Sequence, residues 1–323
     1  ENALYIAILL HDMGHGPFSH AMEHSIVEGI HHEDISLQFM TQLNQEFNGQ
    51  LSLAIEIFKG NYHRKFLLHL ISSQLDMDRM DYLKRDSFYS GVAEGNINSD
   101  RLIQMLTVVD DQLVVEEKGI YSVEKFLVSR RLMYWQAYLH KTSLAAEMIL
   151  TKILKRAKEL TQQGKKLPCT RALQYFMGQK ITSSGFTQDM LENFARLDDY
   201  DVVGAIKEWQ YEDDFVLREL CRMLINRDLL KITMSSEKIE PTQVNELTKQ
   251  VALKYQLSET ESSYFVFTGA VDNKAYNKKG VPIQILMKDK TIKDVTDASD
   301  QLNLKALSKT VTKYFLCFPK VLA

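Results

Sequence analysis

Hydrophobic residues recur along most of the chain with the spacing of buried helix faces. The apolar segment Ala3–Leu10 predicts a buried helix, which ends where two glycines and a proline occur within residues 11–17. Further elements are predicted by the same pattern: helices over residues 19–28, 33–47 and 123–160, one or two helices over residues 64–89, and a short hairpin over residues 106–109 and 113–115. Only five prolines interrupt 323 residues, which favours a mostly helical fold.

The pattern changes in the second half of the chain. Residues 162–168 are polar and end in a proline, which predicts an internal boundary, and residues 169–256 remain helical. Later elements are predicted as follows: strands at residues 264–267, 283–287 and 314–318, and a helix over residues 302–311. The sequence thus predicts a mostly α fold in three parts: a helical core at residues 1–165, a helical extension at 166–240 and a small α+β module at 241–323.

Composition and charge narrow the class of protein. The 45% of hydrophobic and 25% of charged residues are typical of a globular chain and exclude a disordered one. Lys and Arg number 39 against 42 Asp and Glu, which argues against a dedicated nucleic-acid binder but allows a small anionic ligand in a locally basic pocket. Three distant cysteines exclude a disulfide framework, and no apolar run reaches the roughly 20 residues of a membrane span, so we expect a cytoplasmic location. The chain opens at Glu1 within an apolar helix, so we expect an upstream segment.

Histidines are concentrated near the start of the chain, where six of the nine lie between His11 and His32. Glycines and a proline interrupt this segment, so the paired histidines of a continuous zincin helix are excluded. The adjacent His11 and Asp12 can bind one ion where the chain bends, with a further carboxylate from the acidic segment Asp76–Tyr82. Mixed imidazole and carboxylate ligands suit Zn, Fe, Mn, Co or Ni, and suit Mg less well.

Three segments resemble one known family. The segment His11–His20 resembles the signature of the HD-domain phosphohydrolases, in particular the deoxynucleoside triphosphate triphosphohydrolase branch, which includes bacterial relatives of the human SAM-and-HD-domain enzyme. Residues 76–86 are similar to a second block of that branch, and residues 130–141 to a third. The three blocks follow in the family's order, so the resemblance implies an HD catalytic core, truncated at its N-terminus, over residues 1–165.

The resemblance implies a role for each matching residue. One divalent metal ion (Mn, Fe, Zn, Co, Ni or Mg) would be held by two histidines and two aspartates. This chain has three of these four ligands, His11, Asp12 and Asp78, and the first histidine would lie upstream. His15, His20 and His32 would line a phosphate channel, and Glu23 would support the protonated histidine. Tyr82 and Asp86 would face the sugar 3′-hydroxyl of the substrate. The phosphates would be bound by four residues: Arg79, Arg130, Tyr138 and Lys141.

The implied activity is metal-dependent hydrolysis of deoxynucleoside triphosphates to deoxynucleoside and triphosphate. Two alternatives remain open: a nucleoside monophosphate phosphomonoesterase, and a nucleotide-sensing protein with a vestigial site. Relatives suggest two expectations about partners, a homo-oligomer (dimer or tetramer) and an allosteric nucleotide, and the absence of a long apolar run predicts no membrane partner. Competing structural roles are solvated helix charges for Arg79 and Lys141, and core aromatics for Tyr82 and Tyr138. His24 and His31 are expected either to be structural or to support residues that contact the metal or substrate, and His63 and His69 to be ordinary surface and core residues.

Overall fold

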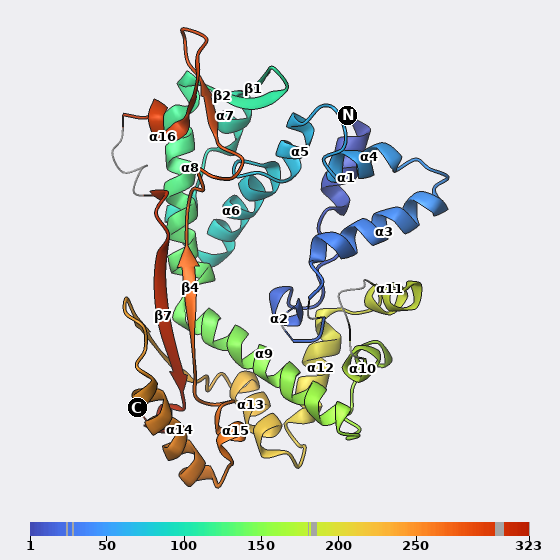
Figure 1. The fold of residues 1–323 in the computed structure, drawn as a ribbon, viewed down its shortest axis with the longest axis vertical. Coiled ribbons are helices and arrows are strands. Elements are labelled where there is room, and N and C mark those ends of the chain that lie inside the picture. Colours follow the sequence, from blue (N-terminus) through green and yellow to red (C-terminus); the bar gives the residue numbers. More distant parts are fainter. Residues whose placement is uncertain (24, 28, 180, 182–185, 301–306, 323) are drawn as a thin grey trace. The chain divides into compact units, whose positions relative to one another are not determined.

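The computed structural model describes residues 1–23, 25–27, 29–179, 181, 186–300 and 307–322, and these are mostly helical, as predicted (Figure 1). Contacts divide the chain into two compact units, each made of three segments. The first unit comprises Glu1–His11, Asn44–His140 and Val271–Thr312, and the second comprises Asp12–Leu43, Lys141–Ala270 and Lys313–Ala323. The predicted segments 1–165, 166–240 and 241–323 follow the order of the sequence and stay a prediction. No helix in the described part of the chain is long and apolar enough to cross a membrane.

The first unit combines helices with a four-stranded sheet. Its helices are α1 (Asn2–Leu10), α4 (Ser52–Phe58), α5 (Phe66–Ile71), α6 (Met77–Ser90), α7 (Ser99–Gln104), α8 (Ile120–Met133) and α16 (Val295–Ala298), with short 3₁₀ turns η1 (Ala93–Gly95) and η2 (Glu117–Gly119). Its strands, in the spatial order β1-β2-β5-β6, are β1 (Leu106–Val109), β2 (Gln112–Glu116), β5 (Gln284–Leu286) and β6 (Ile292–Asp294). The predicted hairpin is confirmed, and its second strand pairs in parallel with β5, which places Val115 opposite Ile285.

Helix α8 fills the core of the first unit. Val123, Phe126 and Leu127 are fully buried and belong to one cluster with Leu83 of α6 and Ile285 of β5. Burial of such side chains is worth about 1.5–3 kcal/mol each. This packing holds α6 and α8 against each other, and these two helices carry most of the predicted substrate residues.

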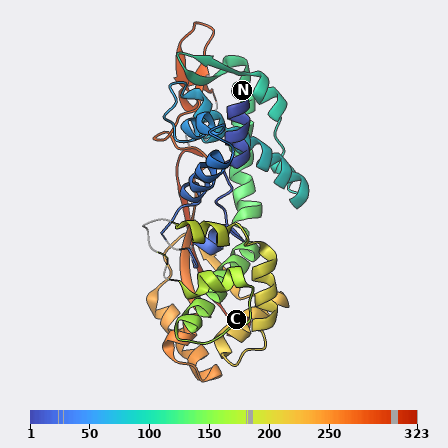
Figure 2. The same ribbon diagram turned by 90° about the vertical axis from the view of Figure 1, so that its right-hand side faces the viewer.

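The second unit is built around α9. Its helices are α2 (His20–Glu23), the start of α3 (His32–Glu46), α9 (Lys141–Gln162), α10 (Arg171–Gly178), α11 (Gln188–Phe194), α12 (Asp199–Trp209), α13 (Phe215–Ile225), α14 (Pro241–Tyr255) and α15 (Glu259–Ser262). Its sheet has the strand order β3-β7-β4, with β3 (Lys231–Ser235), β7 (Val311–Phe318) and β4 (Phe267–Asn273), of which residues 311–312 and 271–273 are assigned to the first unit. The short 3₁₀ turn η4 (Lys320–Leu322) follows β7. Helix α9 packs against α2, α10, α13 and β3, and Figure 2 shows the same helices after a quarter turn.

Several predicted elements need correction. The predicted helix over residues 123–160 is interrupted by a π-helical turn at Tyr134–Tyr138, where the Leu139 amide bonds to the Tyr134 carbonyl at 2.7 Å. Residues 264–266 form a turn rather than a strand; their apolar character reflects burial. Strand β3 lies within a region predicted to be helical, and within residues 19–28 only α2 is helical among the described residues.

The helix ends near the candidate site are mostly where the sequence places them. Helix α1 ends at Leu10, but Tyr5 and Leu9 are exposed, so the prediction of a buried helix holds for Ala7 only. Residues 302–306 of the predicted helix over residues 302–311 lie outside the described residues, and its last residue, Val311, begins β7.

Candidate active site

In the second unit, the loop after His11 packs tightly on the start of α3. The Gly14 amide donates a hydrogen bond to the Ser36 hydroxyl at 2.8 Å. A Cβ at Gly14 would lie 1.9 Å from the His32 carbonyl oxygen, so only glycine permits this approach. The close packing stacks the His15 and His32 rings, with centroids 3.9 Å apart and planes at 17°.

The side chains of His32 and Glu23, in the same unit, are hydrogen-bonded, and they form an ion pair when His32 is protonated. The His32 Nδ1 lies 2.8 Å from Glu23 Oε1, and both side chains are partly buried. A carboxylate accepts hydrogen bonds, so this contact favours a proton on Nδ1 and stabilises the imidazolium when Nε2 is also protonated. The predicted pairing of a histidine with Glu23 therefore has the geometry that proton transfer needs.

Asp12 lies beside the stacked histidines. Its Oδ1 is 3.8 Å from His15 Nε2, and ligand atoms of Asp12, His15 and His32 lie within 4.8 Å of one another. This group also offers a set of donors for a cation, so the geometry admits two roles for His15 and His32: the predicted phosphate channel, or metal ligation.

Substituting Gly14 by alanine is expected to lower the free energy of unfolding by about 1–3 kcal/mol, because the added methyl group would overlap the backbone of α3. Gly204→Ala is the matched control, because Gly204 lies in α12 with open space around its Cβ position. Alanine there should be neutral or stabilising, since it favours a helix. Urea unfolding of both variants measures the difference. Equal stability of the two variants would contradict the close approach at Gly14.

In the first unit, the N-terminus of α6 distinguishes the three acidic residues of Asp76–Tyr82. Asp76 is the buried N-cap, and its side chain accepts hydrogen bonds from the Arg79 and Ser73 amides at 2.7 and 2.8 Å. Asp81 is exposed and pairs with Arg85 one turn later. Asp78 alone of the three forms a ligand group with His11, with donor atoms within 4.8 Å.

His11 is oriented as metal-binding histidines are. Its Nδ1 lies 2.7 Å from the Ile8 carbonyl oxygen, which can only accept, so Nδ1 carries the proton. The lone pair is then on Nε2, and a backbone carbonyl on the other ring nitrogen is a common way to fix a ligating tautomer. Asp12 follows His11 directly in the sequence. These donors fit a divalent transition metal.

The predicted sugar-binding residues share one face of α6. Asp78, Tyr82 and Asp86 follow at intervals of four residues within this helix. The Tyr138 hydroxyl donates a hydrogen bond to Asp86 Oδ2 at 2.6 Å, and the Tyr82 and Tyr138 rings meet edge to face with centroids 6.2 Å apart. Arg79 Nη1 lies 3.5 Å from the Tyr82 hydroxyl. The structure therefore brings these predicted residues together.

Tyr134 joins this group, although the sequence analysis gave it no role. Its ring packs edge to face on Tyr138, with centroids 5.2 Å apart, and the Arg130 guanidinium carbon lies 5.8 Å from its centre. Arg130 Nη1 donates to the Ala275 carbonyl at 3.3 Å, whereas its buried Nε has no hydrogen-bond partner in the described part of the chain. The signal was available, because Tyr134 lies four residues from both Arg130 and Tyr138.

Burial shapes the electrostatics of this group. It raises the pKa of the Tyr82 hydroxyl to about 12, so Tyr82 stays protonated near neutral pH. Burial, with the hydrogen bond to Asp86, also raises the pKa of Tyr138. Burial lowers the pKa of Arg79, but the Asp76 carboxylate and Tyr82 outweigh it, and the pKa lies above its ordinary value. The group therefore presents a fixed positive charge beside neutral hydroxyl donors.

The other residues considered in the sequence analysis, Lys141 and the remaining histidines, have no described contact with the site residues of their own unit. Lys141 is exposed at the first residue of α9 in the second unit. The side chain of His20 and all of His24 lie outside what the structure describes. His31 and His63 are exposed, and His69 is partly buried, with its pKa lowered by burial.

Comparisons with known proteins bear on the family of the chain. A family model described as "HD associated region" matches residues 97–175. The crystal structure of a phosphohydrolase from Bacteroides thetaiotaomicron is 51% identical, with a TM-score of 0.93, and the match covers 98% of this chain and 79% of that one.

Two curated proteins extend the comparison. The uncharacterized protein YwfO of Bacillus subtilis is 33% identical over 97% of this chain and 72% of its own length. A protein of Dictyostelium discoideum named deoxynucleoside triphosphate triphosphohydrolase SAMHD1 homolog is 29% identical over 45% of this chain and 31% of its own length. The similarity to the first relative extends over nearly the whole chain, and that to the second over less than half.

Proposed function

Because this chain belongs to the HD-domain phosphohydrolases, we propose that it hydrolyses deoxynucleoside triphosphates to deoxynucleoside and triphosphate, using one divalent metal ion. The observation that carries the proposal is the group on α6, α8 and the π-helical turn that follows α8, in which two arginines meet three tyrosines and a carboxylate. The name of the Dictyostelium relative supports the same substrate class.

The arginines and tyrosines of the first unit suit an anionic nucleotide. A triphosphate has about four negative charges, and arginine offsets such charge with paired hydrogen bonds. Arg130 has a buried Nε whose hydrogen-bonding capacity the described residues leave unused, and a phosphate oxygen would satisfy it. Asp86 and the protonated Tyr82 can hydrogen-bond a sugar hydroxyl from one helix face.

We propose His11, Asp12 and Asp78 as the ligands of the metal ion. When bound there, a divalent ion would supply Lewis-acid stabilisation of a phosphoryl oxygen. A fourth ligand, the upstream histidine that the resemblance implies, would complete the set. The chain's own contribution is to fix the donor tautomer of His11 through Ile8 and the position of Asp78 through the cap of α6.

We assign proton transfer to His32, held by Glu23. A protonated His32 can give its Nε2 proton to the leaving oxygen, because Glu23 stabilises the positive charge from the Nδ1 side. His15, stacked on the same ring, restricts how His32 can turn. With His20, these residues form the proposed phosphate channel.

The experiment that tests the function is chromatography of the products from a panel of nucleotides, with several divalent metals. Release of triphosphate from deoxynucleoside triphosphates supports the proposal. Release of orthophosphate from monophosphates would identify a phosphomonoesterase. Binding of nucleotides without turnover under any metal would identify a nucleotide sensor.

Sugar discrimination gives a sharper prediction. Tyr82 and Asp86 share one face of α6, so a packed ring against the sugar C2′ leaves a ribose 2′-hydroxyl buried and without a partner. That costs about 1–3 kcal/mol, which corresponds to roughly ten- to hundred-fold preference for deoxyribonucleotides in kcat/KM. Competition between dGTP and GTP, and between dATP and ATP, measures it. Tyr82→Ala should shrink the preference, whereas Arg130→Ala should weaken both sugar classes alike. Equal turnover by the wild type would contradict this role.

A further inference from the structure

The turn that joins His15 to α2 has an unfavourable backbone conformation. Phe18 and Ser19 are consecutive and have φ angles of 52° and 41°, in the left-handed region. Residues with a Cβ rarely adopt this region, and a bulky aromatic residue does so still less often. Two such residues in succession persist only where surrounding structure holds them in place.

One hydrogen bond to this turn comes from α12. The Phe18 amide donates to Asp199 Oδ1 at 3.0 Å, across 181 positions of sequence. Asp199 is the first residue of α12, but Asp198 caps that helix, with its side chain accepting from the Tyr200 and Asp201 amides. The helix is therefore capped without the Asp199 carboxylate, and that carboxylate accepts a hydrogen bond from the turn instead.

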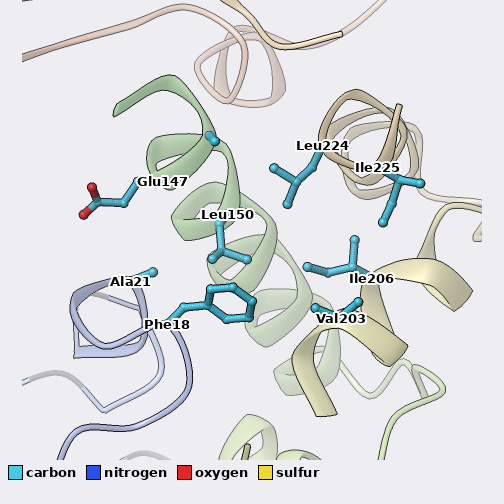
Figure 3. Close-up of a pocket in the computed structure, with 9 residues that line it drawn as sticks. Phe18, Ala21, Glu147, Leu150, Val203, Ile206, Leu224 and Ile225 are labelled. Carbon is cyan, nitrogen blue, oxygen red and sulfur yellow. The ribbon is translucent and has the colours of Figure 1, made fainter. Parts of the chain in front are cut away.

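The side chain of Phe18 meets the same face of α12. Its ring points into an apolar pocket of about 390 Å³, whose wall includes Val203 and Ile206 of α12 and Leu150 of α9 (Figure 3). Residues 199, 203 and 206 are spaced by four and three positions, which places them on one helix face. Helix α12 thus approaches Phe18 in two ways: Asp199 accepts a hydrogen bond from the Phe18 amide, and the Phe18 ring lines one pocket with Val203 and Ile206.

The strained turn leads directly to the proton-transfer pair. The Ser19 carbonyl accepts hydrogen bonds from the Met22 and Glu23 amides, which begins α2. Glu23 in turn holds His32. A change at Phe18 or Ser19 therefore displaces the start of α2 and the carboxylate of Glu23.

We propose that Asp199 is a positioning residue of the active site: it holds Phe18 and Ser19 in the left-handed conformation that places Glu23 against His32. The role of Glu23 and His32 in catalysis rests on the proposed function. The position of the turn itself does not.

The test compares four variants. Asp199→Ala should lower kcat by about ten- to hundred-fold, the size expected for misplaced catalytic groups, with a smaller change in KM, because the proposed substrate residues of α6 and α8 lie in the first unit. Asp199→Asn retains an oxygen acceptor and should keep near wild-type kcat. Glu208→Ala is the control, since Glu208 is an exposed acid on the same helix. Ser19→Gly in the Asp199→Ala background should restore much of kcat, because glycine adopts the left-handed region without strain.

Hydrogen exchange gives a readout that needs no substrate. Amides of residues 19–23 should exchange at least about tenfold faster in Asp199→Ala than in wild type or Glu208→Ala, and Ser19→Gly should reverse part of this change. Unchanged hydrogen exchange of residues 19–23 in Asp199→Ala would overturn the proposal. An equal loss of kcat in Asp199→Ala and Asp199→Asn would overturn it as well. If the wild type hydrolyses no deoxynucleoside triphosphate, the proposed function fails, while hydrogen exchange still decides whether Asp199 positions the turn.

Discussion

His32→Ala should lower kcat by at least about 10²-fold while leaving metal content unchanged, the usual size of effect for a general acid. The physical basis is the Nδ1 contact to Glu23 at 2.8 Å, which stabilises an imidazolium able to give up its other proton. His31→Ala is the matched control, because His31 is the neighbouring histidine and is exposed. Single-turnover rates and elemental analysis of the same preparations measure the two quantities.

A different result would exchange the roles of the histidines. Asp12, His15 and His32 also place donor atoms within 4.8 Å of one another. If His32→Ala loses the metal, His32 is a ligand and the proton donor must be sought elsewhere. Glu23→Gln separates the cases further, because it keeps the shape of the side chain and removes the charge that stabilises the imidazolium.

The sequence predicted local features of the site well, since they depend on local chemistry. The end of α1 at Leu10 follows from the glycines and proline after it, and the structure confirms it. The placement of Tyr82 and Asp86 on one face follows from helical spacing alone. The resemblance singles out Asp78 among three nearby acids as a metal ligand, which stays a prediction; in the structure Asp76 caps α6 and Asp81 pairs with Arg85.

Features that depend on distant contacts could not be predicted in this way. The parallel pairing of β2 with β5 joins residues about 170 positions apart, and no period in either segment indicates its partner. The π-helical turn at Tyr134–Tyr138 lies within a continuous helical pattern, and hydrophobic spacing does not register one inserted residue. Tyr134 is the first residue of that turn, and its spacing of four residues from Arg130 and from Tyr138 was the available signal for it.

Predictions that concern the whole protein remain predictions. They include the homo-oligomer, the allosteric nucleotide, the cytoplasmic location and the three sequence segments. The two compact units do not coincide with the three predicted sequence segments, because each unit combines early, middle and late parts of the chain. Folding of either unit therefore requires contacts of long sequence separation, which argues for testing site variants in the whole chain.

Asp78→Ala is expected to remove most of the bound metal, whereas Asp81→Ala should retain it. Both residues lie on α6 within one turn, but Asp78 forms a ligand group with His11 and Asp81 is an exposed partner of Arg85. Loss of a carboxylate removes a donor and a compensating negative charge, and affinity should fall by more than about 100-fold, beyond the usual effect of changing a residue that only supports a ligand.

Elemental analysis of the purified variants, including Asp12→Ala, measures this difference. Asp12→Ala should behave as Asp78→Ala does, since both supply an oxygen donor in the proposed set. Asp76→Ala adds a contrast, because loss of the α6 cap should lower the unfolding free energy by about 0.5–2 kcal/mol and disturb the metal only through Asp78. Equal metal content in wild type, Asp12→Ala and Asp78→Ala would refute the assignment of the ligands. Metal loss in Asp12→Ala alone would instead favour the group of Asp12 with His15 and His32, because that group shares Asp12 but does not include Asp78.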